Sequence, residues 1–177
     1  MSYVPPHLRK VVQKNIRYKA LVLPMIKNKY IVVQHATKNK NKELTFIGGG
    51  CKAYNKNNHR KCAVRELKEE TKNAIVLNKS RLSTRPNYMF ESNKRFSQKE
   101  RNNNKKRGLH VVLVYKVYKV NMGNNASFNN IYRRFHLPVA HNNKETNNIA
   151  LKSKQELRNA KNPKLWNFMK NYVLNHV

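Results

Sequence analysis

The sequence predicts a single domain of mixed class, α/β or α+β, and three observations support this. The chain has 177 residues, 39% of them hydrophobic, which is enough for one core and too few for two comfortable ones. Segments rich in β-branched residues occur near both ends and in the middle of the chain, and segments with helical spacing follow them. We expect residues 1–17 to form an N-terminal extension and residues 18–177 to form the domain.

Five strand segments are predicted, the last of them directly before the second helix described below. Residues 18–26 and 29–36 are apolar runs joined by a short Lys-Asn turn, which is typical of a hairpin. Residues 43–50, ELTFIGGG, predict a short strand that ends in glycines, which let the backbone turn sharply or approach a ligand. Residues 108–120 predict a long strand, and residues 121–131 an Asn-rich connection.

Three helices are predicted. Residues 59–73 form the first. After a short strand, Ser153 and Glu156 have the S-x-x-E spacing of a capping box and begin the second. The last is expected to open at Asn162 and Pro163. Its expected packing residues are Leu165, Trp166, Phe168, Met169, Tyr172 and Val173.

The composition is strongly basic. Thirty-eight Lys and Arg stand against eight acidic residues, all of them Glu, and the net charge is +30. Such a charge predicts attraction to polyanions: RNA, DNA, inositol polyphosphates or acidic membrane surfaces. Charge alone does not choose among them.

Cysteine usage and hydropathy bear on the compartment. Cys51 and Cys62 predict no disulfide framework and no zinc site, which favours a reducing, intracellular environment. The N-terminus lacks the apolar run of a signal peptide, and no stretch of about 18 apolar residues occurs. We therefore expect a protein without a membrane segment, located in the cytoplasm.

Three of the eight glutamates are crowded into five positions of the first predicted helix. Glu66, Glu69 and Glu70 have the spacing i, i+3 and i+4, so they share one helix face. Like charges in this arrangement repel, and a hard cation such as Mg²⁺ or Mn²⁺ would offset them. The alternative is an ordinary solvated helix face whose partners are lysines.

The order of these segments resembles the signature of the Nudix hydrolases. A strand ending in Gly48–Gly50 precedes a helix that carries Arg65–Glu70, R-E-L-K-E-E, and this matches the family core R-E-U-x-E-E, where U is apolar. The resemblance implies an α/β/α sandwich with a mixed sheet that cleaves a diphosphate linked to another moiety. It also implies that the helix glutamates bind divalent metal.

The resemblance assigns roles to particular residues. Glu66, Glu69 and Glu70, with the carbonyl of Gly50, would hold Mg²⁺ or Mn²⁺. Arg65 would orient a glutamate through a charge-assisted hydrogen bond. In the segment KETNNIALKSKQEL, Glu145 lies where many members keep a catalytic base or a further metal ligand, and Glu91 is the reserve candidate. The alternative for Glu145 is an acidic residue in a surface loop.

The chain also departs from the family pattern. Asn57 stands where the full signature has a glutamate, and Lys72 stands where it has a glycine. One extra residue separates Gly50 from Arg65. We expect retained activity, because all the carboxylates expected to hold metal are present; the alternative is a non-catalytic RNA-binding protein on the same scaffold.

A polymeric substrate is favoured, because a small nucleotide does not require so basic a surface. The segment 92–107 is predicted to be a basic insertion that binds RNA; the alternative is a solubilising loop. The RNA-binding residues would be Lys94, Arg95, Lys99, Arg101, Lys105, Lys106 and Arg107. Four aromatic residues are candidates for stacking a cap guanine or, alternatively, for the core: Tyr88, Phe90, Tyr132 and Phe135.

The G-G-G turn, the loosened signature, E-E-T and the Lys/Asn bias resemble the mRNA-decapping Nudix proteins of large cytoplasmic DNA viruses. That resemblance implies release of methylated GDP from capped RNA, in the host cytoplasm or the virion. Diphosphoinositol polyphosphates and nucleotide diphosphates remain alternative substrates. The segment Tyr3–Leu8 within YVPPHLR resembles motifs that dock the cap-binding translation factor, although Arg9 departs from that pattern; the alternative is an extended tail packed on the fold.

Overall fold

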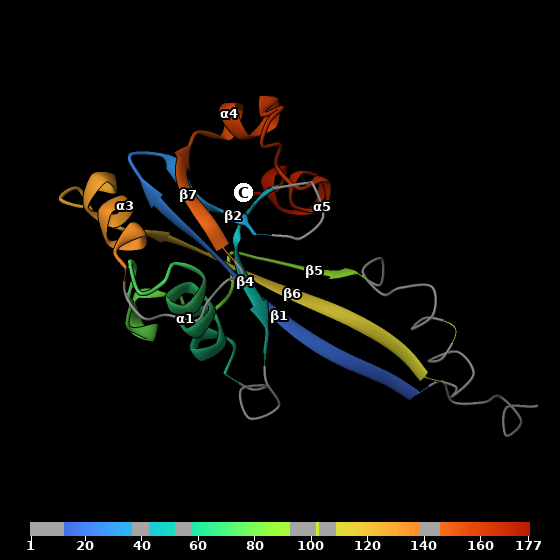
Figure 1. Ribbon diagram of the computed structural model, residues 1–177. Coiled ribbons are helices and arrows are strands. Elements are labelled where there is room, and N and C mark those ends of the chain that lie inside the picture. Colours follow the sequence, from blue (N-terminus) through green and yellow to red (C-terminus); the bar gives the residue numbers. More distant parts are fainter. Residues whose placement is uncertain (1–12, 37–42, 52–57, 93–101, 103–108, 139–145) are drawn as a thin grey trace, which may run out of the picture.

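The fold is a mixed β-sheet with helices on both faces (Figure 1). The computed structural model describes residues 13–36, 43–51, 58–92, 102, 109–138 and 146–177. Within these ranges the α/β/α fold class predicted from the sequence is confirmed. No helix in the described ranges is both long enough and apolar enough to cross a lipid bilayer.

Two long strands form the centre of the sheet. β1 (Gln13–Ile26) and β6 (Leu109–Asn121) run parallel, and their residues pair from Gln13 with Leu109 to Met25 with Asn121. Together they extend beyond the rest of the sheet as a two-stranded ribbon (Figure 1). The predicted long strand over residues 108–120 is therefore confirmed.

The predicted hairpin is confirmed as well, although its first strand begins at Gln13, within the predicted extension 1–17, and not at residue 18. β1 turns into β2 (Lys29–His35) through Lys27 and Asn28, which both have a positive φ. β7 (Thr146–Lys152) pairs antiparallel with β2, and β5 (Tyr88–Ser92) pairs antiparallel with β6.

The predicted third strand over residues 43–50 is divided in two. β3 (Leu44–Thr45) pairs with β2, whereas β4 (Ile47–Gly50) pairs with β1. Phe46 lies between them and is buried, with 1% of its surface exposed. The segment changes its pairing partner at this residue, which is why one continuous strand does not form.

Both faces of the sheet are buried, which explains the continuous apolar runs in its strands. Ala20 and Val22 of β1 face one core, which also contains α1 and α3, and Leu21 and Leu23 face the other, which also contains α4 and the C-terminal helix. The helices are α1 (His59–Glu70), η3 (Lys79–Arg81), α3 (Phe128–His136), α4 (Lys154–Asn159), α5 (Asn167–Met169) and the π-helical continuation η4 (Lys170–Leu174).

The predicted capping box at the start of α4 is confirmed. The backbone N–H of Ser153 donates to Glu156 Oε2 at 2.7 Å, and the N–H of Glu156 donates to Ser153 Oγ at 3.1 Å. A local pattern sufficed because every partner lies within one helical turn.

Other helix boundaries differ from the predictions. The first helix ends at Glu70 rather than 73, because Lys72 and Asn73 adopt left-handed backbone conformations with φ of 52° and 62°. The Asn-rich connection is only partly irregular: α3 begins at Phe128, where Ser127 caps it by accepting from the N–H of Asn130.

The last helix begins at Asn167 and not at Asn162. Residues 164–166 are held against β3 instead, because the N–H of Leu44 donates to Lys164 O at 2.8 Å and the N–H of Trp166 donates to Leu44 O at 2.9 Å. Of the predicted packing residues, Leu165, Phe168, Met169 and Val173 are buried, and Trp166 and Tyr172 are partly buried against the same core.

The prediction of unpaired cysteines is wrong. Cys51 and Cys62 form a disulfide, with 5.4 Å between their Cα atoms. Cys51 directly follows β4 and Cys62 lies in the first turns of α1, so the packing of α1 beside β4 brings the two together. The 11-residue separation in the sequence does not reveal this contact.

Candidate functional site

The glycine-rich end of β4 lies unusually close to β1. Gly48 has a φ of +151°, and a Cβ there would lie 2.7 Å from Leu21 Cα and would overlap the carbonyl oxygen of Ala20. Only glycine permits this approach. β4 can therefore pair closely with β1 and present residues 48–50 to the helix that follows.

Gly49 provides the contact with that helix. A Cβ at Gly49 would overlap the carboxylate of Glu66, so this carboxylate lies directly against the glycine backbone. Gly50 is exposed, with no atom within 4 Å of the corresponding position.

Helix α1 is fixed in place by its cap and its apolar face. The side chain of Asn58 accepts a hydrogen bond from the N–H of Lys61 at 3.0 Å. Cys62, Ala63 and Leu67 are completely buried under the sheet. The face that carries the glutamates is consequently directed toward β4.

Arg65 connects the elements of the site. Its Nη1 donates to Glu69 Oε2, and its Nη2 donates to Glu66 Oε1 and, at 3.0 Å, to the carbonyl of Gly50. The sequence predicts such a charge-assisted bond to one glutamate, and Arg65 makes it to two. The guanidinium thereby offsets the repulsion between the carboxylates.

Glu70 is the buried member of the group, with 4% of its surface exposed. Its Oε2 accepts from the N–H of Gly48 at 3.0 Å, and its carbonyl accepts from Thr146 Oγ1 at 2.8 Å. The end of α1, the glycine turn and the start of β7 therefore meet at this residue.

A neighbouring pair of rings lies at the start of α1. The His59 ring is 4.6 Å from that of Tyr18, and Lys116 Nζ is 5.3 Å from the Tyr18 centroid. Burial lowers the pKa of His59, and the charge of Lys116 lowers it further. Both effects favour the neutral imidazole, which avoids a repulsive charge at the helix N-terminus.

The glycine turn, Arg65 and the helix glutamates border a cleft of about 400 Å³, a volume typical of small-molecule sites. One side carries the glycine turn, Arg65 and the three glutamates. Five further lining residues were not identified as site residues in the sequence: Lys19, His35, Thr45, Trp166 and Met169. They come from β1, the end of β2, β3 and the C-terminal segment, and no local pattern links these to α1.

The donor set of the cleft suits a hard divalent cation. Carboxylate and carbonyl oxygens from Glu66, Glu69, Glu70 and Gly50 are the ligands that Mg²⁺ and Mn²⁺ prefer. In the ranges that the structure describes, no three His, Cys or Glu side chains already converge as a complete metal site. Arg65 instead contacts Glu66, Glu69 and the Gly50 carbonyl, so these oxygens are gathered around one positive charge.

Several predicted site residues lie outside the described residues. They are Glu145, the segment Tyr3–Leu8, and the basic residues Lys94, Arg95, Lys99, Arg101, Lys105, Lys106 and Arg107. The reserve candidate Glu91 is on β5, exposed, and not among the cleft residues.

The four aromatic candidates for base stacking do not line the cleft. Phe135 is 1% exposed and belongs to the core beneath α3, so stacking a ligand there is ruled out. Phe90 stacks on Tyr115 at 4.7 Å, and Tyr88 stacks on His176 at 4.6 Å. Tyr132 is 43% exposed on α3.

Comparisons with known proteins agree with this architecture. A family model described as NUDIX domain matches residues 16–157. The chain is similar to the solved structure of a MutT protein from Methanosarcina mazei Go1, with 11% identity, a TM-score of 0.54 and 94% of each chain covered. No curated protein matches the chain.

Two further solved structures are similar. One is a MutT NUDIX hydrolase from Burkholderia pseudomallei, with 10% identity, a TM-score of 0.53, and 92% of this chain and 98% of that chain covered. The other is the NUDIX domain of Shewanella oneidensis NrtR complexed with ADP ribose, with 13% identity, a TM-score of 0.54, and coverages of 98% and 90%. At these identities the likeness concerns the fold alone.

Proposed function

The chain belongs to the NUDIX domain family, and we propose that it is a metal-dependent hydrolase that cleaves the pyrophosphate linkage of capped mRNA and releases methylated GDP. Nudix hydrolases generally use divalent ions such as Mg²⁺ or Mn²⁺. The observation that carries the proposal is the cleft into which α1 and β4 bring Glu66, Glu69, Glu70 and the glycine turn. In this proposal residues 18–177 are the hydrolase domain and residues 1–17 an extension.

The carboxylates and the Gly50 carbonyl would hold the metal. When bound, Mg²⁺ or Mn²⁺ supplies Lewis-acid stabilisation of the pyrophosphate oxygens and lowers the pKa of water. Arg65 keeps Glu66 and Glu69 oriented, and the Gly48 N–H keeps the Glu70 carboxylate in place. Glu145 is the proposed base that accepts the proton of the attacking water.

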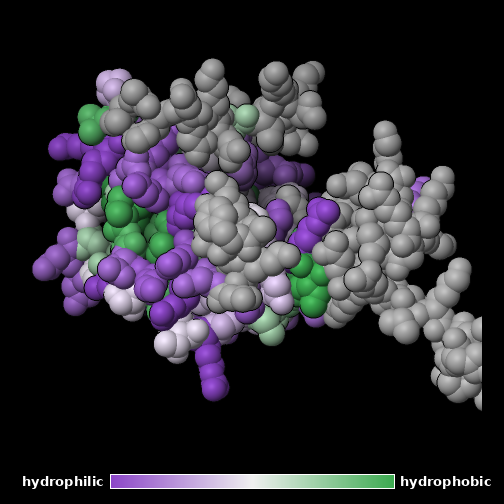
Figure 2. Space-filling model, turned by 90° about the horizontal axis from the view of Figure 1, so that it is seen from below, coloured by the Kyte–Doolittle hydropathy of each residue, from purple (hydrophilic) through white to green (hydrophobic). Residues whose placement is uncertain are grey.

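Charge supports a polymeric RNA substrate. A net charge of +30 attracts a phosphate backbone, which a small nucleotide would not require. Among the coloured residues of the face shown in Figure 2, hydrophilic side chains predominate and smaller hydrophobic areas interrupt them. The basic run in residues 92–107 is the proposed RNA-binding segment, and Tyr3–Leu8 is the proposed contact with a cap-binding translation factor. If the chain is viral, it would act in the host cytoplasm or be carried in the virion.

The test uses RNA labelled in its cap phosphates. The wild-type protein is incubated with this RNA in Mg²⁺ or Mn²⁺ and, separately, with a chelator. We expect metal-dependent release of methylated GDP, reduced on the order of 100-fold or more in Glu69→Gln and Glu70→Gln. Glutamine keeps the acceptor oxygen that Glu70 offers to Gly48, so the fold should survive.

Glu156→Gln is the matched control. It removes one carboxylate outside the cleft, and glutamine also serves in a capping box, so turnover should equal that of the wild type. If wild-type protein binds RNA tightly and releases no product, decapping is wrong. Release of phosphate from a diphosphoinositol polyphosphate or a nucleotide diphosphate in parallel assays would then identify the substrate, and no turnover at all would indicate a binding protein.

A further inference from the structure

We propose that Trp166 is the residue on which the cleft holds the base of its substrate, so that the cleft selects a nucleotide and not a diphosphoinositol polyphosphate. This inference rests on the proposed function, because it names the substrate class of the same cleft. Trp166 lines the cleft together with Glu66, Glu69 and Glu70. It is the only tryptophan in the chain.

The backbone of Trp166 is firmly placed. Its N–H donates to Leu44 O at 2.9 Å, and its carbonyl accepts from the N–H of Lys170 at 3.0 Å. One residue earlier, Leu165 forms a parallel bridge with Leu44. Trp166 is thus held both to the sheet through β3 and to the first turn of the C-terminal helix.

The indole ring is supported from behind by other rings. It stacks on Phe168, with 5.0 Å between centroids and 27° between planes. Phe168 in turn packs against Tyr115 at 5.1 Å and Tyr172 at 5.0 Å. Trp166 is only partly buried and lines the cleft, so an aromatic residue held by neighbouring rings is in place before any ligand arrives.

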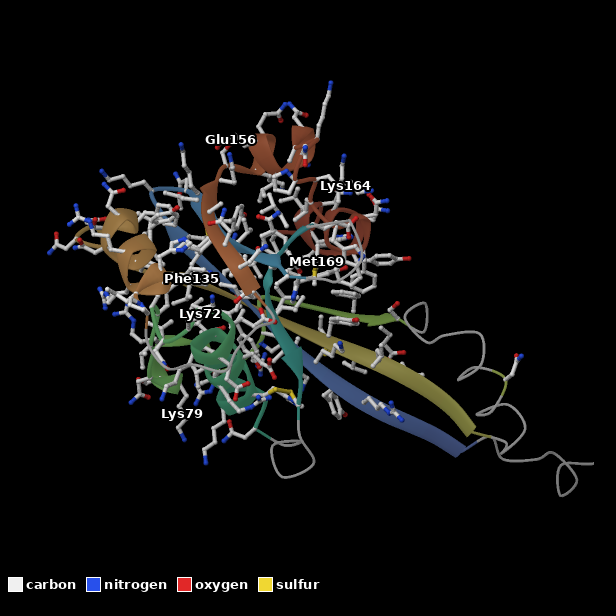
Figure 3. The ribbon with its side chains drawn as sticks, in the orientation of Figure 1. Lys72, Lys79, Phe135, Glu156, Lys164 and Met169 are labelled. Carbon is white, nitrogen blue, oxygen red and sulfur yellow. A yellow bond between two sulfur atoms is a disulfide. The ribbon has the colours of Figure 1, made fainter. Side chains whose placement is uncertain are left out.

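Met169 completes the apolar part of this wall. It lies at the end of α5, on the side of the helix that faces the sheet (Figure 3), and 3% of its surface is exposed. An aromatic base between Trp166 and this apolar surface would be removed from water. The carboxylates on the other side of the cleft would remain near the phosphates.

The charges of the cleft argue against an inositol polyphosphate. Its described lining contains two lysine or arginine side chains, Lys19 and Arg65, together with three glutamates. Arg65 already contacts Glu66 and Glu69. A ligand with phosphates around its whole ring requires cations on several sides, whereas a nucleotide requires charge at one end and a flat apolar surface at the other.

A methylated guanine carries a positive charge on its ring, and tryptophan is the aromatic side chain that binds cations best. We therefore expect methylated GDP to bind more tightly than GDP. Inorganic pyrophosphate lacks a base and should not contact Trp166.

Because Trp166 is the single tryptophan, its intrinsic fluorescence tests the contact directly. Full-length Glu69→Gln protein is titrated in Mg²⁺ with 7-methyl-GDP, GDP, pyrophosphate and inositol hexakisphosphate at equal ionic strength, and calorimetry verifies saturation. We expect quenching by the two nucleotides and none by the other two ligands. Saturation by 7-methyl-GDP without any change of fluorescence would overturn the proposal.

Substitutions provide the second measurement. Base–aromatic stacking predicts a rise in KM for capped RNA of roughly 5- to 150-fold in Trp166→Leu, with kcat nearly unchanged. Trp166→Phe keeps a ring and should recover most of the affinity. An unchanged KM in Trp166→Leu contradicts the inference. Thermal unfolding shows whether Trp166→Leu has a folding defect. If it has one, the KM of Trp166→Phe and the fluorescence titration of the protein with Trp166 intact test the inference instead.

The two proposals can fail separately. Quenching by nucleotides without any hydrolysis leaves the base contact in place and removes the decapping function. Hydrolysis that is lost in Glu69→Gln but unchanged in Trp166→Leu supports the decapping function and contradicts the base contact.

Discussion

At the level of single residues, the glycines of β4 have different reasons for being glycine. Gly48 is required by the approach of β1, whereas Gly49 is required by the carboxylate of Glu66. Gly50 has free space at the position of a Cβ and contributes its carbonyl. At Gly48 and Gly49, therefore, the neighbouring atoms leave no room for a Cβ, whereas at Gly50 a Cβ would fit.

Gly49→Ala should displace the Glu66 carboxylate. Because the new methyl group overlaps that carboxylate, we expect turnover to fall by about 10-fold or more, since a misplacement of about 1 Å is costly in a catalytic site. Far-UV circular dichroism should be retained. Gly50→Ala meets no atom within 4 Å and should lose much less activity; equal losses in the two variants would contradict this account.

Lys72 explains one departure from the family signature. The family has glycine at this position, and Lys72 has a φ of 52°, a conformation that glycine adopts without strain. The lysine has a compensating contact, because its Nζ lies 4.7 Å from the centroid of the Phe135 ring. The strain and the cation–π contact are of similar size, about 1 kcal/mol each.

We expect Lys72→Gly to have nearly wild-type stability in urea unfolding. Lys72→Ala should be less stable than Lys72→Gly by about 1 kcal/mol, since both lose the contact with Phe135 and only alanine keeps the strain. Equal stability of the two variants would show that the left-handed backbone is not maintained in solution.

At the level of elements, the disulfide joins the end of β4 to the first turns of α1. It closes a loop whose ends are 11 residues apart in the sequence, and it joins the residue after β4 to α1, the two elements that carry the glycine turn and the glutamates of the cleft. Its main effect in the chain-entropy view is to restrict the unfolded state.

Cys51→Ser should lower the free energy of unfolding by roughly 2–3 kcal/mol. A dithiol reductant reduces the protein disulfide to two thiols and is itself oxidised to a disulfide. It should lower the free energy of unfolding of the wild type by a similar amount. It should have no effect on Cys51→Ser, which serves as the control. Urea unfolding with and without the reductant measures the stability of both proteins. If the reductant leaves the stability of the wild type unchanged, the disulfide does not stabilise the fold.

The capping box of α4 predicts a pH dependence. Hydrogen bonds from the Ser153 backbone and side chain lower the pKa of Glu156, with smaller contributions from the charges of Lys29 and Lys152. The folded pKa lies below the unfolded one, so this stabilisation is present above about pH 4.5 and is lost as the pH falls through the folded pKa. The side chain is substantially exposed, so the effect is small.

Ser153→Ala removes the side-chain hydrogen bond, which is the second cause of this shift, and leaves the backbone N–H of residue 153 in place. We expect the Glu156 carboxyl to titrate at a higher pH in the variant, and the stability difference from wild type to shrink between pH 5 and pH 3. Nuclear magnetic resonance of the Glu156 side chain, with Glu43 as internal reference, measures it. Identical titration of Glu156 in both proteins would contradict the assignment.

At the level of the whole molecule, a net charge of +30 is the property most relevant to a nucleic-acid partner. The self-repulsion of such a chain is relieved when a polyanion binds, and counterion release then makes the affinity depend on salt.

RNA affinity should fall steeply with salt, by roughly 10³-fold or more between 50 and 200 mM if at least six phosphates are neutralised. Glu69→Gln should show the same slope, because it changes the cleft and leaves the basic surface intact. Filter binding at several salt concentrations measures this. A flat dependence would mean that the excess charge does not contact the phosphate backbone.

Local patterns were enough for much of the fold and for the acidic half of the cleft. The hairpin, the long strand, the capping box of α4 and the shared face of Glu66, Glu69 and Glu70 depend on residues within one turn or one strand. The family core R-E-L-K-E-E identified α1 and its relation to the glycine turn for the same reason.

Sheet pairing, in contrast, joins residues far apart in the chain, and no local spacing encodes it. Only the register of β4 on β1 puts Gly49 under Glu66, and only the bridge between Leu44 and Leu165 brings Trp166 to the cleft. The disulfide and the burial of Phe135 likewise follow from which helix packs on which face. The sequence by itself therefore determined the acidic half of the cleft, because its residues lie in one helix and one turn. Only the tertiary structure decided the rest of the lining, because the pairing of strands distant in the chain brings Trp166 and the other residues there.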